Sequence, residues 1–145
     1  MIVYDKPVLR RPYSEAAAEN GHLHEGKLAY LNANGEIELA GPNTAMPIGV
    51  ISEPDGELTT MLGNRPGASI ILFSCQSVVQ VKVTGGGVYF VPGALLRVNA
   101  DGLASYSDGE PGHKIVGVAV QGCTGDKAGQ LVDAILCTPY VARSN

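Results

Sequence analysis

The chain has 145 residues, of which 19 are glycine and nine are proline, and it carries a formal net charge of -4 at pH 7. Its hydrophobic fraction of 45% is too high for a disordered chain, and its negative charge argues against nucleic acid as a main partner, because phosphate binding needs a concentrated basic face. We also expect no membrane span, because the longest apolar runs are far shorter than a bilayer crossing, and no signal peptide, because the start "MIVYDKPVLRR" lacks an apolar stretch.

Residues 1–24 are predicted to form an extended N-terminal arm. Pro7 and Pro12 each fix φ and remove an N–H donor, so we expect the arm to stay outside the β core and the core to fold without it. Such an arm docks on a neighbouring subunit or on a support surface; the alternative is a frayed terminus. The predicted partner contacts are Lys6, Pro7, Val8, Leu9, Arg10, Arg11, Pro12 and Tyr13.

The stretch "SEAAAENG" at 14–21 is the one candidate helix, with Ser14 as a possible N-cap and Gly21 as a possible stop. It is too short to be stable without packing. His22 and His24 follow it as an H-x-H pair, but no further ligand completes a metal site at usable spacing. We interpret the pair as part of a solvated loop.

A repeat dominates the rest of the chain. The stretch "EGKLAYLNANGEIELA" from Glu25 returns as "PGALLRVNADGLASYS" from Pro92, with the matching residues 67 positions apart. Period-two alternation on both sides of Asn-Gly or Asp-Gly predicts a β-hairpin in each copy. A short buried strand follows each hairpin, "IGV" at 48–50 and "VGV" at 116–118. We therefore predict that the backbones of 26–51 and 93–119 superpose, with Asn34 or Gly35 and Asp101 or Gly102 at equivalent turn positions.

Further strands are predicted between and after the repeats. In "SVVQVKVTGG" the side chains of Val79, Val81 and Val83 share one face. The segment "GVYFVPG" at 87–93 leads into the second repeat, and "LVDAILCTPYV" ends the pattern. The predicted fold is all-β, a small β-barrel or sandwich built from two similar halves with the extended arm. The predicted domains are an arm at 1–24 and a duplicated β domain at 25–145, with repeat 1 at about 25–75 and repeat 2 at about 92–138.

Candidate catalytic and ligand sites are sparse. The pair Asp108 and Glu110 lies in "SDGEPG", which is ordinary turn composition, and His113 is interpreted as a loop residue. The stretches "GGG" at 85–87 and "GDKAG" at 125–129 lack the features of a phosphate loop. We expect no catalytic, cofactor or metal site, and no enzyme activity. Three cysteines without CxxC spacing are interpreted as small core residues in a reducing compartment: Cys75, Cys123 and Cys137.

The second half resembles the phage capsid cement proteins, also called head decoration proteins. The resemblance lies in the order of "VYFVPGALLRVNADGLASYS", "KIVGVAV" and "GDKAGQLVDAIL", and the first half carries a plainer form of it in "EGKLAYLNANGEIELA" and "PIGVI". It covers residues 25–138. It implies a structural virion protein, made in the host cytoplasm, that sits on the outer capsid surface as a homotrimer. There it would bind the major capsid protein, bridge capsomers and need no cofactor. The arm departs from the family pattern, so its contacts are not carried over.

A different class of function is the alternative. A small duplicated β-barrel can bind a sugar or another small ligand in its mouth, or serve as a non-catalytic domain of a larger assembly. Ligand sites usually gather aromatic side chains, whereas the six tyrosines and two phenylalanines of this chain are dispersed. This dispersal favours the structural role.

Overall fold

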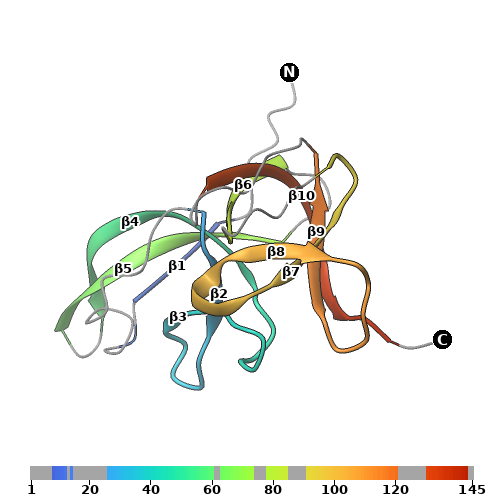
Figure 1. Ribbon diagram of the computed structural model, residues 1–145. Coiled ribbons are helices and arrows are strands. Elements are labelled where there is room, and N and C mark those ends of the chain that lie inside the picture. The colour runs from blue at the N-terminus through green and yellow to red at the C-terminus, as the bar shows by residue number, and fades with distance from the viewer. Residues whose placement is uncertain are drawn as a thin grey trace.

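The computed structural model describes ten β-strands and one short 3-10 turn (Figure 1). The strands are β1 (Val8–Pro12), β2 (Leu28–Leu31), β3 (Ile37–Leu39), β4 (Gly49–Thr60), β5 (Gly63–Leu72), β6 (Val78–Val83), β7 (Leu95–Val98), β8 (Ala104–Ser107), β9 (Lys114–Ala119) and β10 (Gln130–Val141), and the turn is η1 (Ala100–Gly102). The described residues are 8–12, 14, 26–60, 63–73, 78–84, 91–120 and 130–143, without the side chains of residue 8 and residues 53–66. The predicted helix at 14–21 lies outside them, except for Ser14.

The strands form two five-stranded sheets. One has the order β1-β5-β4-β2-β3, and the other closes into a barrel with the order β10-β6-β8-β7-β9. We call β1–β5 unit 1 and β6–β10 unit 2. When each strand of unit 1 is matched in chain order with a strand of unit 2, every antiparallel pairing of unit 1 has its counterpart in unit 2. The predicted all-β fold of two similar halves is therefore confirmed.

The strand register is also duplicated. Leu28 pairs with Val50 in unit 1, and Leu95 pairs with Val118 at the equivalent position of unit 2. The register between β4 and β5 matches that between β9 and β10, because Gly49 pairs with Leu72 and Gly117 pairs with Leu136. The predicted correspondence of 26–51 with 93–119 thus holds residue by residue in the strands.

The two hairpin turns are closed by equivalent hydrogen bonds, but the residues with positive φ differ between them. Asn32 N donates to Glu36 O at 3.0 Å, and Asn99 N donates to Leu103 O at 2.8 Å. In the first turn only Gly35 has a positive φ, of 73°, among its loop residues. In the second turn both Asp101 and Gly102 have positive φ, of 61° and 72°. Aspartate tolerates this region, and Asp101 is also held by an ion pair to Lys27 at 3.0 Å.

The expectation that the prolines keep the arm out of the β core is wrong for Val8–Pro12. These residues form β1, which pairs antiparallel with β5 and is the counterpart of β6, since Leu9 lies opposite Ile70 as Val79 lies opposite Ala134. Pro12 is tolerated because it ends a strand at the edge of the sheet. The first structural unit therefore begins upstream of the sequence repeat.

The first and third strands of each unit are joined by equivalent hydrogen bonds. Ser14 N donates to Ile37 O at 3.1 Å in unit 1, and Thr84 N donates to Ala104 O at 2.9 Å in unit 2. In unit 2 this seam also includes the parallel pair Val83 and Ala104, which closes the barrel. The segment "VLRRPYS" at 8–14 therefore corresponds to "VVQVKVT" at 78–84. This weak similarity is the sequence signal for β1 that the repeat analysis missed.

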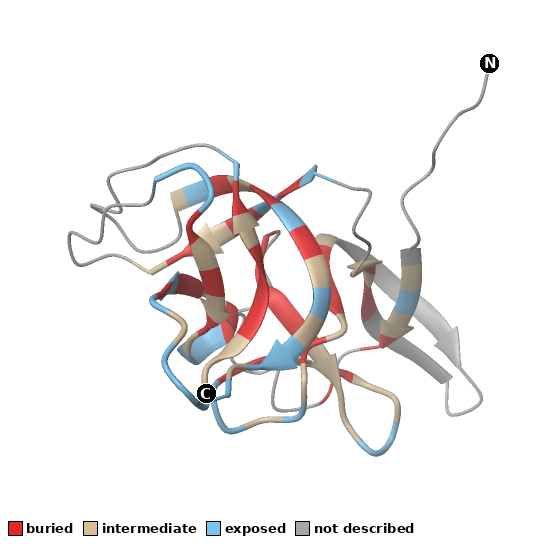
Figure 2. Cartoon of the chain, turned by 90° about the vertical axis from the view of Figure 1, so that its right-hand side faces the viewer, coloured by how far each residue is buried: buried red, intermediate tan, exposed pale blue. Residues whose placement is uncertain are grey.

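Two hydrophobic cores lie inside the units. The smaller core belongs to unit 1 and contains Ala29, Ile37, Ile51, Ala68 and Ile70. The larger core fills unit 2 and includes the three valines predicted to share a face in β6, which are at most 3% exposed. Three side chains of unit 1 also belong to the larger core: Leu28, Ala40 and Val50. The two units are therefore packed together as one block. Burial alternates along β6 and β7, and Figure 2 shows buried, intermediate and exposed residues following one another along the strands.

Polar contacts reinforce the junction between the units. Lys82 N of β6 donates to Gly26 O at 2.8 Å, and Gly102 N of η1 donates to Ala40 O at 2.8 Å. The ammonium of Lys27, whose side chain is only 7% exposed, pairs with Asp101. The backbone around Gly26 thus lies beside β6, and this places Leu28 in the core of unit 2.

Candidate docking surface

Exposed large hydrophobic side chains gather on one unit. Among the described side chains, every large hydrophobic one that is exposed lies between residues 78 and 141, and none belongs to unit 1. Isolated exposed apolar residues are normal, whereas a concentration on one face indicates an interaction surface. They are Val78, Val91, Tyr106, Val120, Leu131, Ile135, Tyr140 and Val141.

A cross-strand row connects part of this surface. Leu95 lies opposite Val118, Val118 opposite Ile135, and Ile135 opposite Val78, so the row crosses β7, β9, β10 and β6. Side chains directly opposite each other on antiparallel strands share a face. We call these four residues the open row, because Ile135 is 38% and Val78 is 49% exposed while the other two are half-buried. The adjacent residues on the same strands point to the barrel interior and are buried.

Unit 1 has the same row in a different environment. Leu28 lies opposite Val50, and Val50 lies opposite Ile71. We call these three the covered row, because Leu28 and Val50 are 0% and 1% exposed and Ile71 packs, half-buried, on the core of unit 2. The rows occupy equivalent positions in equivalent sheets. Among the described side chains of the two rows, only those of the covered row pack on the core of the other unit.

A pocket of about 290 Å³ lies where the two units meet. Its walls come from β4 and β5 on one side and from β6 and β10 on the other. The covered row contributes Val50 and Ile71, and the open row contributes Val78. Polar groups of Ser52, Gln80 and Asp133 also line it; the full lining is Val50, Ile51, Ser52, Ile71, Val78, Val79, Gln80 and Asp133. The pocket therefore lies between the units, not in the mouth of a barrel.

The described residues among the predicted arm contacts range from exposed to buried. Arg11 is half-buried and its Nε donates to the carbonyl of Gly35 at 2.7 Å, so its guanidinium is engaged within its own chain. Arg10, one residue earlier, is exposed, and Pro12 is buried. The contact of these residues with a partner stays a prediction. Three other predicted contacts lie outside the described residues: Lys6, Pro7 and Tyr13.

Replacing Arg11 with alanine is expected to lower the free energy of unfolding by about 1 kcal/mol, because a half-buried hydrogen bond from a charged donor is lost. The control is Arg10→Ala, for which we expect a change within about 0.5 kcal/mol, because the interactions of an exposed charged side chain contribute little to stability. Urea denaturation followed by circular dichroism measures both. Equal effects of the two substitutions would contradict an internal role for Arg11.

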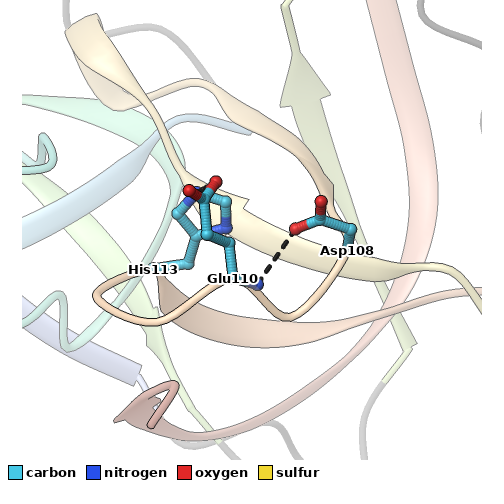
Figure 3. Close-up of side chains that lie close together, drawn as sticks. All are labelled: Asp108, Glu110 and His113. Atoms are coloured by element: carbon cyan, nitrogen blue, oxygen red, sulfur yellow. Dashed lines mark hydrogen bonds and ion pairs between the residues drawn. The ribbon is translucent and has the colours of Figure 1, made fainter. Parts of the chain in front are cut away.

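The acidic residues of the 108–113 loop lie close to His113 (Figure 3). Ligand atoms of Asp108, Glu110 and His113 all lie within 4.8 Å of one another. However, His113 Nε2 is 3.5 Å from a carboxylate oxygen of Glu110, and His113 Nδ1 is 2.9 Å from Ser107 Oγ. Glu110 N also donates to Asp108 Oδ1 at 2.9 Å. These contacts all lie within the turn that the sequence composition indicates, and the absence of a metal site there stays a prediction.

The phenol of Tyr30 has a raised pKa. Burial, followed by the charge of Glu38 and its hydrogen bond, raises the pKa of Tyr30 above the usual 10.0. The phenol lies 3.3 Å from Glu38 Oε2 and stays neutral, so it donates to the carboxylate. Tyr30 packs on the core of unit 2 and is structural in this arrangement.

Other sequence candidates are placed only in part. Cys137 lies half-buried in β10. His22, His24, Cys75 and Cys123 lie outside the described residues, as do the 85–87 and 125–129 stretches. Within the described ranges, no helix has the length and apolarity needed to cross a membrane.

No protein-family model matches the chain, and no curated protein matches it with significant similarity.

Proposed function

We propose that the chain is a structural virion protein that decorates and stabilises the outside of a phage capsid by bridging capsomers. The single observation that carries the proposal is the gathering of exposed large hydrophobic side chains on unit 2. The order and spacing of motifs over residues 25–138 support it independently, because they resemble those of the capsid cement proteins.

A rigid surface with exposed apolar side chains suits a protein that binds and bridges other subunits. Protein interfaces bury apolar and aromatic side chains at their centre, and unit 2 offers Tyr106, Tyr140 and several valines for that purpose. Two β units that share packing and backbone hydrogen bonds hold such a surface in a fixed shape. The proposed partners are the major capsid protein and further copies of this chain in a homotrimer, and the proposed location is the outer capsid surface. No catalytic step is part of this role.

Undecorated phage shells assembled from a major capsid protein are expected to bind the wild-type protein at a saturable number of outer sites. Replacing Tyr140 and Val141 together with glutamate is expected to weaken shell binding at least tenfold. These two side chains are 47% and 45% exposed at the end of β10, and burying an unpaired charge there is costly. The measurement is co-sedimentation with the shells, with density on the outside of the particle checked by electron microscopy.

The matched control is Asn43→Glu together with Ala45→Glu, which adds the same two charges at exposed positions of unit 1 and should leave shell binding unchanged. Wild-type protein that stays in the supernatant at micromolar shell concentrations would contradict the decoration role. Unchanged binding of the double variant would contradict the part assigned to unit 2.

The pocket between the units is the observation that favours the alternative, a small-ligand or carbohydrate module. Its volume of about 290 Å³ lies at the lower limit of small-molecule sites, and three of its lining residues offer polar groups. A ligand that fills it would stabilise the folded state and raise the melting temperature. A panel of monosaccharides and disaccharides that produces such a shift, lost in Ser52→Leu, would favour this alternative over decoration.

A further inference from the structure

We infer that the open row (Leu95, Val118, Ile135 and Val78) is a contact face for a second copy of this chain. This inference deepens the proposed function, because it assigns one part of the unit 2 surface to contacts between copies.

The internal duplication supplies the first argument. The covered row occupies the same register positions in unit 1 as the open row does in unit 2. It is buried because the other unit of the chain, which has the same strand order, packs on it. Within the chain, the surface that covers such a row is therefore the apolar core of a second β unit. The described part of the chain holds no third unit for the open row, and a second copy would supply one.

The chemistry of the two rows supports the same conclusion. Leucine and valine stand at the first two positions of both rows, and isoleucine stands at the third position of both. On a sheet surface exposed to water, these positions usually carry polar side chains. The open row has therefore kept the apolar character that burial requires, although only two of its four side chains are even half-buried in the isolated chain.

Continuity with the existing interface is the third argument. The end of the open row at Val78 lines the pocket together with Val50 and Ile71 of the covered row. A second copy seated on the open row would extend the interface between the units without a break.

The test is the oligomeric state of the full chain in solution. Sedimentation equilibrium of the wild-type protein from 10 µM to 1 mM, on the order expected for a small apolar interface, should show a mass that rises with concentration. Ile135→Glu is expected to weaken this self-association at least tenfold. Because Ile135 is already 38% exposed, the variant should keep the wild-type melting temperature, and this measurement confirms that it is folded.

The matched control is Tyr140→Glu, which adds the same charge on the same strand but outside the row. It should self-associate like the wild type. A wild-type protein that stays monomeric to 1 mM would overturn the inference, as would an Ile135→Glu variant that associates as strongly as the wild type. Equal weakening by Tyr140→Glu would also overturn the assignment to this row.

Failure of this inference is distinguishable from failure of the proposed function. Ile135→Glu should still bind undecorated shells, but as separate copies with lower occupancy. The variant with glutamate at both 140 and 141 should self-associate and yet fail to bind shells. If Ile135→Glu lost shell binding while keeping self-association, the row would belong to the shell contact and not to a second copy.

Discussion

Replacing Gly117 with alanine is expected to lower the free energy of unfolding by about 3 kcal/mol, although it adds only one methyl group. A Cβ atom at this position would lie 2.3 Å from the carbonyl oxygen of Ile135. That oxygen belongs to the backbone of β10, which pairs with β9 at Gly117 and Leu136. The methyl group can be accommodated only if the two paired strands move apart, and this movement breaks the ladder that joins them.

The same effect is expected at the equivalent position of unit 1. A Cβ atom on Gly49 would lie 2.3 Å from Ile71 O and 2.4 Å from Ile70 Cγ2. The control is Gly41→Ala, because the nearest atom there is Thr44 Cγ2 at 3.7 Å, an ordinary contact distance. We expect that control to change stability by less than about 0.5 kcal/mol. Chemical denaturation measures all three, and a Gly117→Ala protein as stable as the control would contradict the close approach of the strands.

Leu28→Ala is expected to lower the free energy of unfolding by about 3 kcal/mol, because it leaves a cavity at the junction of the two units. Leu28 is fully buried and belongs to the core of unit 2. Its counterpart Leu95 has the same side chain at the same register position of the second hairpin, but it is half-buried on the outer surface. We expect Leu95→Ala to cost about 1 kcal/mol or less, since much less contact is lost.

The two leucine variants form a matched pair. Thermal and chemical denaturation of both, at concentrations low enough to exclude self-association, compare their stabilities directly. Equal losses would mean that the covered row and the open row have the same environment, in contradiction to the packing of unit 2 on unit 1. At high concentration, Leu95→Ala should instead weaken the association between copies.

The sequence by itself was sufficient for the local features of this fold. Residue alternation around "NANG" and "NADG" predicted both hairpins, because turn geometry and strand periodicity depend on neighbouring residues only. The burial of Val79, Val81 and Val83 followed from the same alternation. The fixed offset between the repeats predicted the duplication, since equal local patterns form equal local structures.

Only the tertiary structure decided which segments pair and which faces are covered. The strand β1 pairs with β5 about sixty residues away, and its proline and two arginines hide the strand pattern, although an edge position tolerates them. Arg11 turns to the carbonyl of Gly35 within the same unit, a contact that no spacing in the sequence indicates.

The contrast between Leu28 and Leu95 shows the physical reason most directly. Both residues stand four residues before the asparagine of "NA" in equivalent hairpins, and their local sequences predict the same strand and the same face. One is buried and the other is half-exposed because the second unit packs against only one of the two sheets. Burial of this kind depends on long-range packing between surfaces, and such packing is not contained in the periodicity of either segment.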